Sequence, residues 1–406
     1  MNKNHQKIIF FLLFIFQATV FAAEQKRLTI VFDWFINPNH APLLMAEQEG
    51  FFAKHGLQVK FITPADVSEG EKMVAANRAD VAVTYQPVLT YHVVRGLPVI
   101  RFATLIDNPL NCFVALDGGP ISSLQDLKGK RIGSSASEVD NIIFSTMLES
   151  AGLSLKDLTM VNVGFNLTST LLTKKIDGFT GGMRNFEPLA VEVAGKKPRV
   201  FYPEEYGFPK YDELIFVTNK NKINDHVLVD FTEALKECIL YLKKNPKEGW
   251  EKFAFRHPEL NNALNKKAWL KTLPYFASDP AKLDRKRYEG LMQFMWQKKQ
   301  IARLPKLEEY AVEIGKKDEA NNAGVNAKVE LTILPGVVAN FDPTSNPGAI
   351  GVFAGGHVNL TIANNSRVIA EITEVKLSGS ETGLKIDKLY CADKAKSGVM
   401  YAGLPH

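Results

Sequence analysis

The sequence predicts an α/β protein built from two similar halves, followed by a smaller all-β module. Up to about residue 220, short apolar strands alternate with helical segments and are joined by short loops. From 230 to 310 the pattern is helical throughout, and beyond 325 only short β-like runs remain, separated by Gly, Pro, Asn and Asp. Repeated strand–helix–strand order favours a mostly parallel, doubly wound sheet.

The strands of both halves are predicted from apolar runs that alternate or end at turn residues. In the first half these runs cover residues 28–32, 57–62, 79–83 and 99–105. In the second half they cover residues 111–116, 130–133, 160–163, 178–182, 200–202 and 213–218. Helices are expected between them, most clearly over 43–49, 69–77, 138–150 and 168–175. Ser123 is expected to cap a helical turn, with Asp126 completing the capping pair.

The amino-terminal segment has the pattern of a secretory signal peptide. Lys3 and Lys7 precede the apolar run 8–16, and small residues follow near Ala22. The run is short for a membrane span, and no cysteine near the cleavage site would allow a lipid anchor. We therefore expect a protein that is secreted and not lipid-anchored.

Composition excludes several classes of function. The formal charge of +5 is mild for 406 residues, and no long basic run carries interleaved aromatics, so nucleic acid is not expected as a partner. The three cysteines, Cys112, Cys238 and Cys391, are too widely spaced for a metal motif, and the first two are expected to be buried thiols. No nucleophile elbow, phosphate loop or metalloprotease motif is present. The sequence thus predicts no catalytic residues, metal or cofactor.

Polar and aromatic side chains gather instead where the predicted strands end. The first strand runs into an acid, an indole, asparagines, a histidine and two prolines, which cannot continue a strand. Ligands of open α/β sheets bind at this edge. Aromatic rings would wall a planar ligand, and carboxylates and amides would fix its donors and acceptors. The candidate ligand-binding residues are Asp33, Trp34, Asn37, His40, Tyr85, Gln86, Asn111, Arg184, Asn185, Glu187, Tyr211 and Glu213.

Two other interpretations of these features stay open. Arg184 and Glu187 could simply pair at the surface, and Tyr211 could end a loop. Gly133, Ser134 and Ser135 open a predicted helix whose backbone N–H groups could hold an anion. A small solute of the sulfonate or nitrate type is therefore an alternative ligand.

Several motifs resemble the solute-binding proteins related to thiamine-pyrimidine synthase, over about residues 27 to 310. The similarity is strongest to periplasmic binders that deliver formylaminopyrimidine, a thiamine pyrimidine precursor, to ABC importers. The motifs that carry the resemblance are Asp33-Trp34-Phe35, Asn37-Pro38-Asn39-His40-Ala41-Pro42, Glu49-Gly50-Phe51-Phe52, Ala79-Asp80-Val81-Ala82-Val83-Thr84-Tyr85-Gln86-Pro87, Arg184-Asn185-Phe186-Glu187 and Tyr211-Asp212-Glu213.

The resemblance implies the type II periplasmic binding fold, with two lobes joined by two crossovers near 111–116 and 214–219. It implies that Trp34, Tyr85, Asn185, Glu187 and Tyr211 approach a pyrimidine, and that the partner is an inner-membrane ABC permease. We expect a monomer. The expected domains are a signal peptide (1–22), lobe 1 (24–112 and 216–314), lobe 2 (113–215), a linker (315–325) and an all-β module of unknown role (326–406).

The same family contains enzymes, which provide the second alternative function. The resemblance implies that these synthases carry a Lys and a His where this sequence has Thr84 and Val88. They also carry a cysteine-rich iron-binding run, whereas residues 202–216 contain no cysteine. We therefore expect a binding protein of thiamine pyrimidine salvage, and no enzyme.

Overall fold

The computed structural model describes residues 25–66, 69–135 and 137–315, together with six strand segments between 329 and 402. The chain divides into two compact units, Met1–Gly315 and Lys316–His406. The predicted signal peptide (1–22) lies outside the described residues, as do nearly all of the linker (315–325) and most of the module (326–406). The described strands of the second unit are β11 (Val329–Ile333), β12 (Gly351–Val352), β13 (Val358–Asn359), β14 (Val375–Gly379), β15 (Leu389–Ala392) and β16 (Val399–Ala402).

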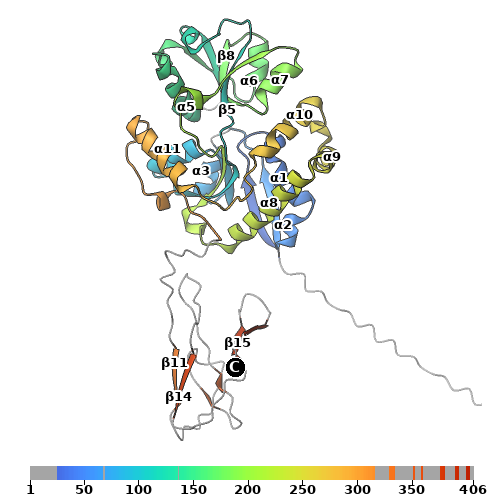
Figure 1. Cartoon of the computed structure of the whole chain (residues 1–406), viewed down its shortest axis with the longest axis vertical. Helices are drawn as coiled ribbons and strands as arrows, with labels where there is room; N and C mark the ends of the chain where they lie inside the picture. Colours follow the sequence, from blue (N-terminus) through green and yellow to red (C-terminus); the bar gives the residue numbers. More distant parts are fainter. Residues whose placement is uncertain are drawn as a thin grey trace, which may run out of the picture. The chain divides into compact units, whose positions relative to one another are not determined.

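Two five-stranded sheets form the two lobes of the first unit (Figure 1). Lobe 1 has the strand order β2-β1-β3-β10-β4, and lobe 2 has the order β7-β6-β8-β5-β9. The strands of lobe 1 are β1 (Lys26–Val31), β2 (Leu57–Ile62), β3 (Val81–Thr84), β4 (Val99–Ile106) and β10 (Leu214–Asn219). The strands of lobe 2 are β5 (Asn111–Leu116), β6 (Arg131–Ser134), β7 (Thr159–Asn162), β8 (Gly178–Met183) and β9 (Pro198–Phe201).

Both sheets are mixed, so the prediction of a mostly parallel sheet is wrong in this respect. Strand β10 runs antiparallel to β3 and β4, and β5 runs antiparallel to β8 and β9. The remaining pairs, including β1–β2 and β6–β7, are parallel. Each reversed strand is the first that the chain enters after crossing between lobes. A strand buried on both faces has the same apolar pattern in either direction, so periodicity could not reveal the reversal.

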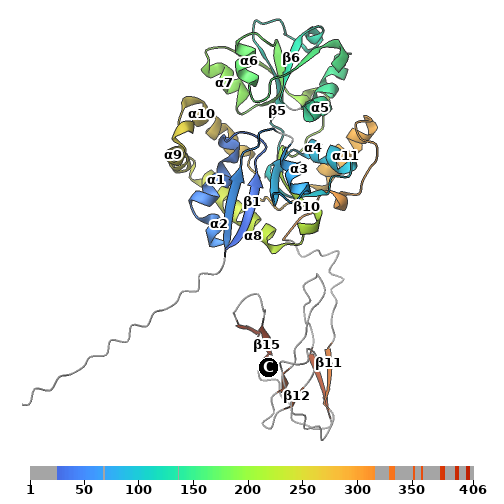
Figure 2. The ribbon, with the colours of Figure 1, turned by 180° about the vertical axis from the view of Figure 1, so that it is seen from behind.

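Long helices cover the sheet of lobe 1 on both faces (Figure 2). Helix α8 buries one side of its nineteen residues, and Phe231 packs edge-on against Phe216 with ring centroids 5.1 Å apart. The helices of this lobe are α1 (Ala41–Gln48), α2 (Phe51–Lys54), α3 (Glu69–Ala75), α4 (Gln86–Val94), α8 (His226–Lys244), α9 (Pro246–Arg256), α10 (Ala263–Thr272) and α11 (Arg285–Gln297). The carboxy-terminal helical segment of the first unit therefore completes lobe 1.

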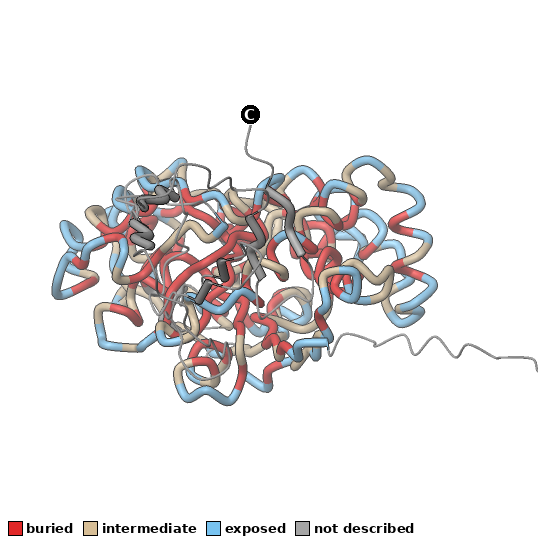
Figure 3. Tube along the Cα trace, turned by 90° about the horizontal axis from the view of Figure 1, so that it is seen from below, coloured by how far each residue is buried: buried red, intermediate tan, exposed pale blue. Residues whose placement is uncertain are grey.

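Lobe 2 has a smaller set of helices, α5 (Ser137–Ser150), α6 (Leu167–Leu172) and α7 (Glu187–Val193). On α5 the predicted apolar face is confirmed, because Ile143, Met147 and Leu148 are buried. Phe144 stacks on Phe113 of β5 with centroids 5.3 Å apart. In Figure 3 the buried residues, in red, lie on inner parts of the trace, and exposed residues lie mostly on its outer turns. The buried residues form separate clusters in the two lobes, so each lobe has its own core.

Two short segments carry the chain between the lobes. Residues 107–110 lie between β4 of lobe 1 and β5 of lobe 2, and residues 202–213 lie between β9 and β10. The segments expected as crossovers, 111–116 and 214–219, are instead β5 and β10, so each crossing comes just before the predicted place. Two crossings side by side allow the lobes to move as rigid bodies about them.

Two local predictions are confirmed. Cys112 and Cys238 are free thiols and fully buried. Ser123 and Asp126 form a capping box on the 3₁₀ turn Leu124–Leu127, where the backbone N–H of Ser123 donates to Asp126 Oδ2 over 2.8 Å. The backbone N–H and the hydroxyl of Ser122 also donate to Asp126 Oδ2. The hydrogen bonds from Ser122 and Ser123 hold the pKa of Asp126 well below its usual range.

Candidate functional site

The loop after β1 is built around the buried carboxylate of Asp33. Its Oδ1 lies 3.0 Å from Nε2 of His40, and its Oδ2 accepts a 2.6 Å hydrogen bond from the Tyr85 hydroxyl. Nδ1 of His40 accepts the backbone N–H of Asn37, so the imidazole carries its proton on Nε2 and donates it to Asp33. The side chain of Asn37 in turn caps the backbone N–H of Asn39. These predicted site residues are thus brought together and hold one another in place.

The side chain of Trp34 is not part of this polar group and contacts lobe 2 instead. Its indole lies edge-on to Phe165, with ring centroids 4.6 Å apart, and Phe35 contacts Phe165 and Phe186 at 6.1 and 6.3 Å. All four rings are only partly buried. Trp34 and Phe35 come from lobe 1, and Phe165 and Phe186 come from lobe 2, so these rings form an aromatic contact between the lobes. Phe165 was not predicted, since nothing in its local sequence marks it as a site residue.

On the lobe 2 side, oxygen atoms gather where β5 begins and β8 ends. Asn111 pairs with Met183 across the two strands, and the Met183 N–H donates to Glu187 Oε2 over 2.6 Å. Burial raises the pKa of Glu187 to about 7. Oδ1 of Asn111 and Oδ1 of Asn185 are buried and have no hydrogen-bond partner among the described residues. Asn185 and Glu187 follow Met183 closely in the chain, and Asn111 is its cross-strand partner, so three predicted residues supply oxygen atoms to this part of the junction.

Other predicted residues tie the two crossovers together. Glu213 Oε2, on the second crossing, accepts the hydroxyl of Tyr211 and two backbone N–H groups, those of Leu110 at the end of the first crossing and of Asn111 at the start of β5. Burial raises the pKa of Glu213, while these hydrogen bonds oppose that shift. Tyr211 and Glu213 are thus engaged in joining the crossings.

Arg184 and Gln86 also bind the crossovers. Arg184 donates to the carbonyl of Asn111, pairs with Glu204 at 2.6 Å and lies over the ring of Tyr202. It does not pair with Glu187 as the surface interpretation proposed. Gln86 Oε1 accepts the backbone N–H of Asp212 over 2.8 Å, at the carboxyl end of the second crossing. Both residues lie at the lobe junction, with these polar atoms bound within the protein.

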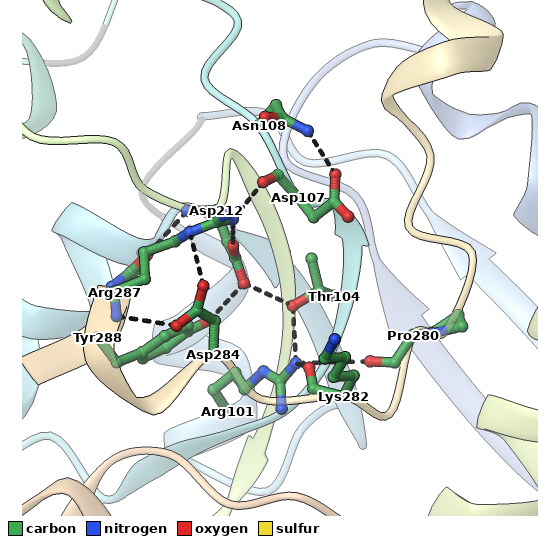
Figure 4. Close-up of polar contacts among 11 residues, drawn as sticks. Arg101, Thr104, Asp107, Asn108, Asp212, Pro280, Lys282, Asp284, Arg287 and Tyr288 are labelled. Carbon is green, nitrogen blue, oxygen red and sulfur yellow. Dashed lines mark hydrogen bonds and ion pairs between the residues drawn. The ribbon is translucent and has the colours of Figure 1, made fainter.

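A buried polar network anchors the two crossings, which together form the hinge, to lobe 1 (Figure 4). Sequence reasoning missed this network. Arg287 of α11 reaches both crossings, because it donates to the Asp107 carbonyl and pairs with Asp212 at 2.6 Å. The second oxygen of Asp212 accepts hydrogen bonds from Thr104 and Tyr288. Burial and the neighbouring charge of Asp212 raise the pKa of Asp107. Arg287 lies far from the crossings in sequence, so no local pattern could link them.

The described residues offer no group of three or more His, Cys, Asp or Glu side chains that could hold a metal ion. Among the same residues, no helix combines the length and apolarity needed to cross a membrane. The arrangement at the lobe junction supplies aromatic rings, buried carboxyl groups and amide oxygens, which are groups that orient a small organic molecule.

Two mixed α/β lobes joined by two crossings define the type II periplasmic binding protein fold. An alkanesulfonate-binding protein from Xanthomonas axonopodis superposes on 72% of this chain and 99% of its own with a TM-score of 0.58. Its sequence identity is only 13%, so this similarity concerns the fold alone. The family model described as "NMT1/THI5 like" matches residues 37–249, and the chain belongs to that family.

Relatives of known name agree with this assignment. A "Putative thiamine biosynthesis protein" from Haemophilus influenzae is 44% identical over 291 residues, covering 71% of this chain and 93% of its own. A formylaminopyrimidine-binding protein from Halalkalibacterium halodurans is 28% identical, covering 59% of this chain and 73% of its own. A 4-amino-5-hydroxymethyl-2-methylpyrimidine phosphate synthase from Legionella pneumophila is also 28% identical, covering 64% and 83%. The family therefore contains both binders and enzymes.

Proposed function

We propose that this protein is a periplasmic solute-binding protein that delivers a thiamine pyrimidine precursor, of the formylaminopyrimidine or hydroxymethylpyrimidine type, to an ABC permease. The ligand would lie between the two lobes. The observation that carries the proposal is the buried carboxyl group of Glu187, together with the unpartnered oxygens of Asn111 and Asn185, where β5 begins and β8 ends.

Buried acceptors without a partner raise the free energy of the protein, so a ligand whose N–H groups donate to them would bind more tightly. An aminopyrimidine carries an exocyclic amino group next to a ring nitrogen. A carboxyl group with a pKa of about 7 can supply the matching donor and acceptor, because it is readily protonated near neutral pH. The indole of Trp34 offers a flat apolar surface at the same junction.

The relatives support this class of ligand, since one is named for binding formylaminopyrimidine and others for making a related pyrimidine. We propose binding without catalysis. Thr84, which resemblance aligns with a lysine of the synthases, is buried and donates its hydroxyl to Glu71 over 2.7 Å. A threonine hydroxyl cannot form the imine that an amine forms with an aldehyde cofactor.

Isothermal titration calorimetry of the full chain tests the ligand. We expect heat with formylaminopyrimidine or hydroxymethylpyrimidine, and none with nitrate or an alkanesulfonate. Trp34→Ala should weaken binding, whereas Trp296→Ala, on the exposed side of α11, should not. If neither pyrimidine gives heat, the proposed class of ligand is rejected. An imine absorbance band after addition of pyridoxal phosphate would instead favour an enzyme.

A further inference from the structure

A single side-chain amide joins the two lobes at the end of the junction where α7 and α10 meet (Figure 1). Nδ2 of Asn185, in lobe 2, lies 2.7 Å from Oδ1 of Asn39 and 2.6 Å from Oγ1 of Thr272. Asn39 lies on the 3₁₀ turn Pro38–His40, and Thr272 ends α10, so both partners belong to lobe 1. All three side chains are at least 95% buried.

The protons of this group can be assigned from the contacts. The Thr272 hydroxyl donates its one proton to the carbonyl of Ala268 over 2.7 Å, as threonine commonly does within a helix. Its oxygen must therefore accept from Asn185, which fixes Nδ2 as the atom that faces it. Because Oδ1 of Asn39 takes the other proton, both N–H bonds of Asn185 are donated to lobe 1.

We propose that Asn39, Asn185 and Thr272 form an interlobe latch that stabilises the contact between the lobes before any ligand is bound. Asn39 and Thr272 are positioning residues in this scheme. When the lobes separate, water replaces the protein partners, so each bond contributes only modestly. When the lobes meet without a partner for Asn185, a buried donor stays unsatisfied, and this penalty makes the latch specific.

Polar contacts on the opposite flank of the junction are weaker candidates for this role. Lys298, directly after α11, pairs with Glu149 of α5 at 2.5 Å, but both side chains are more than one third exposed. Exposed ion pairs contribute little because water and salt screen them. Gln300 donates to the carbonyl of Ile142 over 2.9 Å and to the hydroxyl of Ser145 over a longer 3.4 Å, and both contacts are only partly buried. The amide of Asn185 is therefore the stronger link, because both of its bonds are buried and short, at 2.7 and 2.6 Å.

The latch also couples closure to ligand binding, and this extension depends on the proposed function. Oδ1 of Asn185 has no partner among the described residues, although the amide group itself is fixed by lobe 1. A ligand N–H that donates to Oδ1 would meet an amide already turned toward it. Pre-orientation of this kind lowers the cost of binding, because the amide loses no further freedom. The side chain of Asn185 would then both stabilise the contact between the lobes and bind the ligand.

The test measures lobe separation in the full chain without ligand. Dyes are attached at Lys54→Cys in lobe 1 and Lys197→Cys in lobe 2, two exposed positions, in a Cys391→Ser background. Cys112 and Cys238 are buried and should not react. Single-molecule energy transfer then gives the ratio of closed to open molecules.

Thr272→Val should reduce the closed-to-open ratio by about 5- to 150-fold, the range expected when a buried donor loses its partner. Thr232→Val is the matched control, because Thr232 is equally buried on α8 and makes the same intrahelical bond, to Leu228, without contacting lobe 2. In an Asn185→Ala background, Thr272→Val should have no further effect, because the two changes remove the same interaction.

Three results would overturn the latch. One is an equal effect of the Thr272 and Thr232 substitutions, another is an undiminished effect of Thr272→Val in the Asn185→Ala background. The third is a wild-type protein whose lobes stay apart throughout. None of these outcomes depends on which ligand is bound, so failure of the latch is distinguishable from failure of the proposed ligand.

Discussion

Glu187→Gln is the substitution that best tests the candidate site, because it should stabilise the protein while changing a binding residue. Burial raises the carboxyl pKa from 4.5 to about 7 in the folded chain. In the unfolded chain the group ionises at its ordinary value. Between these two pH values, folding therefore becomes less favourable as pH rises. A rise in pKa from 4.5 to about 7 corresponds to about 3 kcal/mol.

The sign follows from which state holds the proton. Below pH 4.5 the carboxyl group is protonated in both states, and its full contribution to stability is present. That contribution is lost as pH rises through the folded-state pKa of about 7. Glutamine has the same shape, keeps an acceptor for the Met183 N–H, and does not titrate. The stabilising effect of Glu187→Gln should thus grow from pH 5 to pH 8, by up to about 3 kcal/mol.

Urea unfolding at pH 5, 6, 7 and 8 measures this difference. Glu192→Gln is the matched control, since Glu192 is exposed on the same helix and should give a pH-independent difference. If the difference in unfolding free energy between Glu187→Gln and the wild type does not change with pH, the burial argument is refuted. If the complex with an aminopyrimidine retains one proton, wild-type affinity should also fall by about tenfold per pH unit above pH 7. Calorimetry should find no such fall for Glu187→Gln.

The remaining predictions concern the hinge, the cores and the second unit. Arg287→Gln leaves the buried Asp212 without its ion-pair partner and should cost about 3 kcal/mol in urea unfolding. Gly178→Ala should cost about 1–3 kcal/mol, because a Cβ would lie 2.5 Å from the Phe113 ring. Phe231→Ala should cost about 3–5 kcal/mol by opening a cavity under α8. Removal of residues 316–406 should leave pyrimidine affinity unchanged in calorimetry, and a large loss would contradict a site within the first unit.

Local chemistry was enough to locate most elements. The apolar alternation over 57–62 predicted β2 at the residues it occupies, and the apolar face of α5 is buried as expected. Gly and Pro marked the turns, because they favour backbone conformations that end strands and helices. The loop after β1 could also be recognised, since its prolines and polar side chains cannot continue a strand.

The sequence by itself thus determined where strands and helices form, the family to which the chain belongs, and the loop that contributes Asp33 and Trp34 to the lobe junction. Only the tertiary structure decided that β5 and β10 run against their neighbours. It also decided which polar groups are already satisfied, as Asp33 and Glu213 are, and which keep an unpartnered oxygen, as Asn111 and Asn185 do. Hydrogen bonds such as that from Asn185 to Thr272 join residues far apart in the chain, and the distance between them is set by packing.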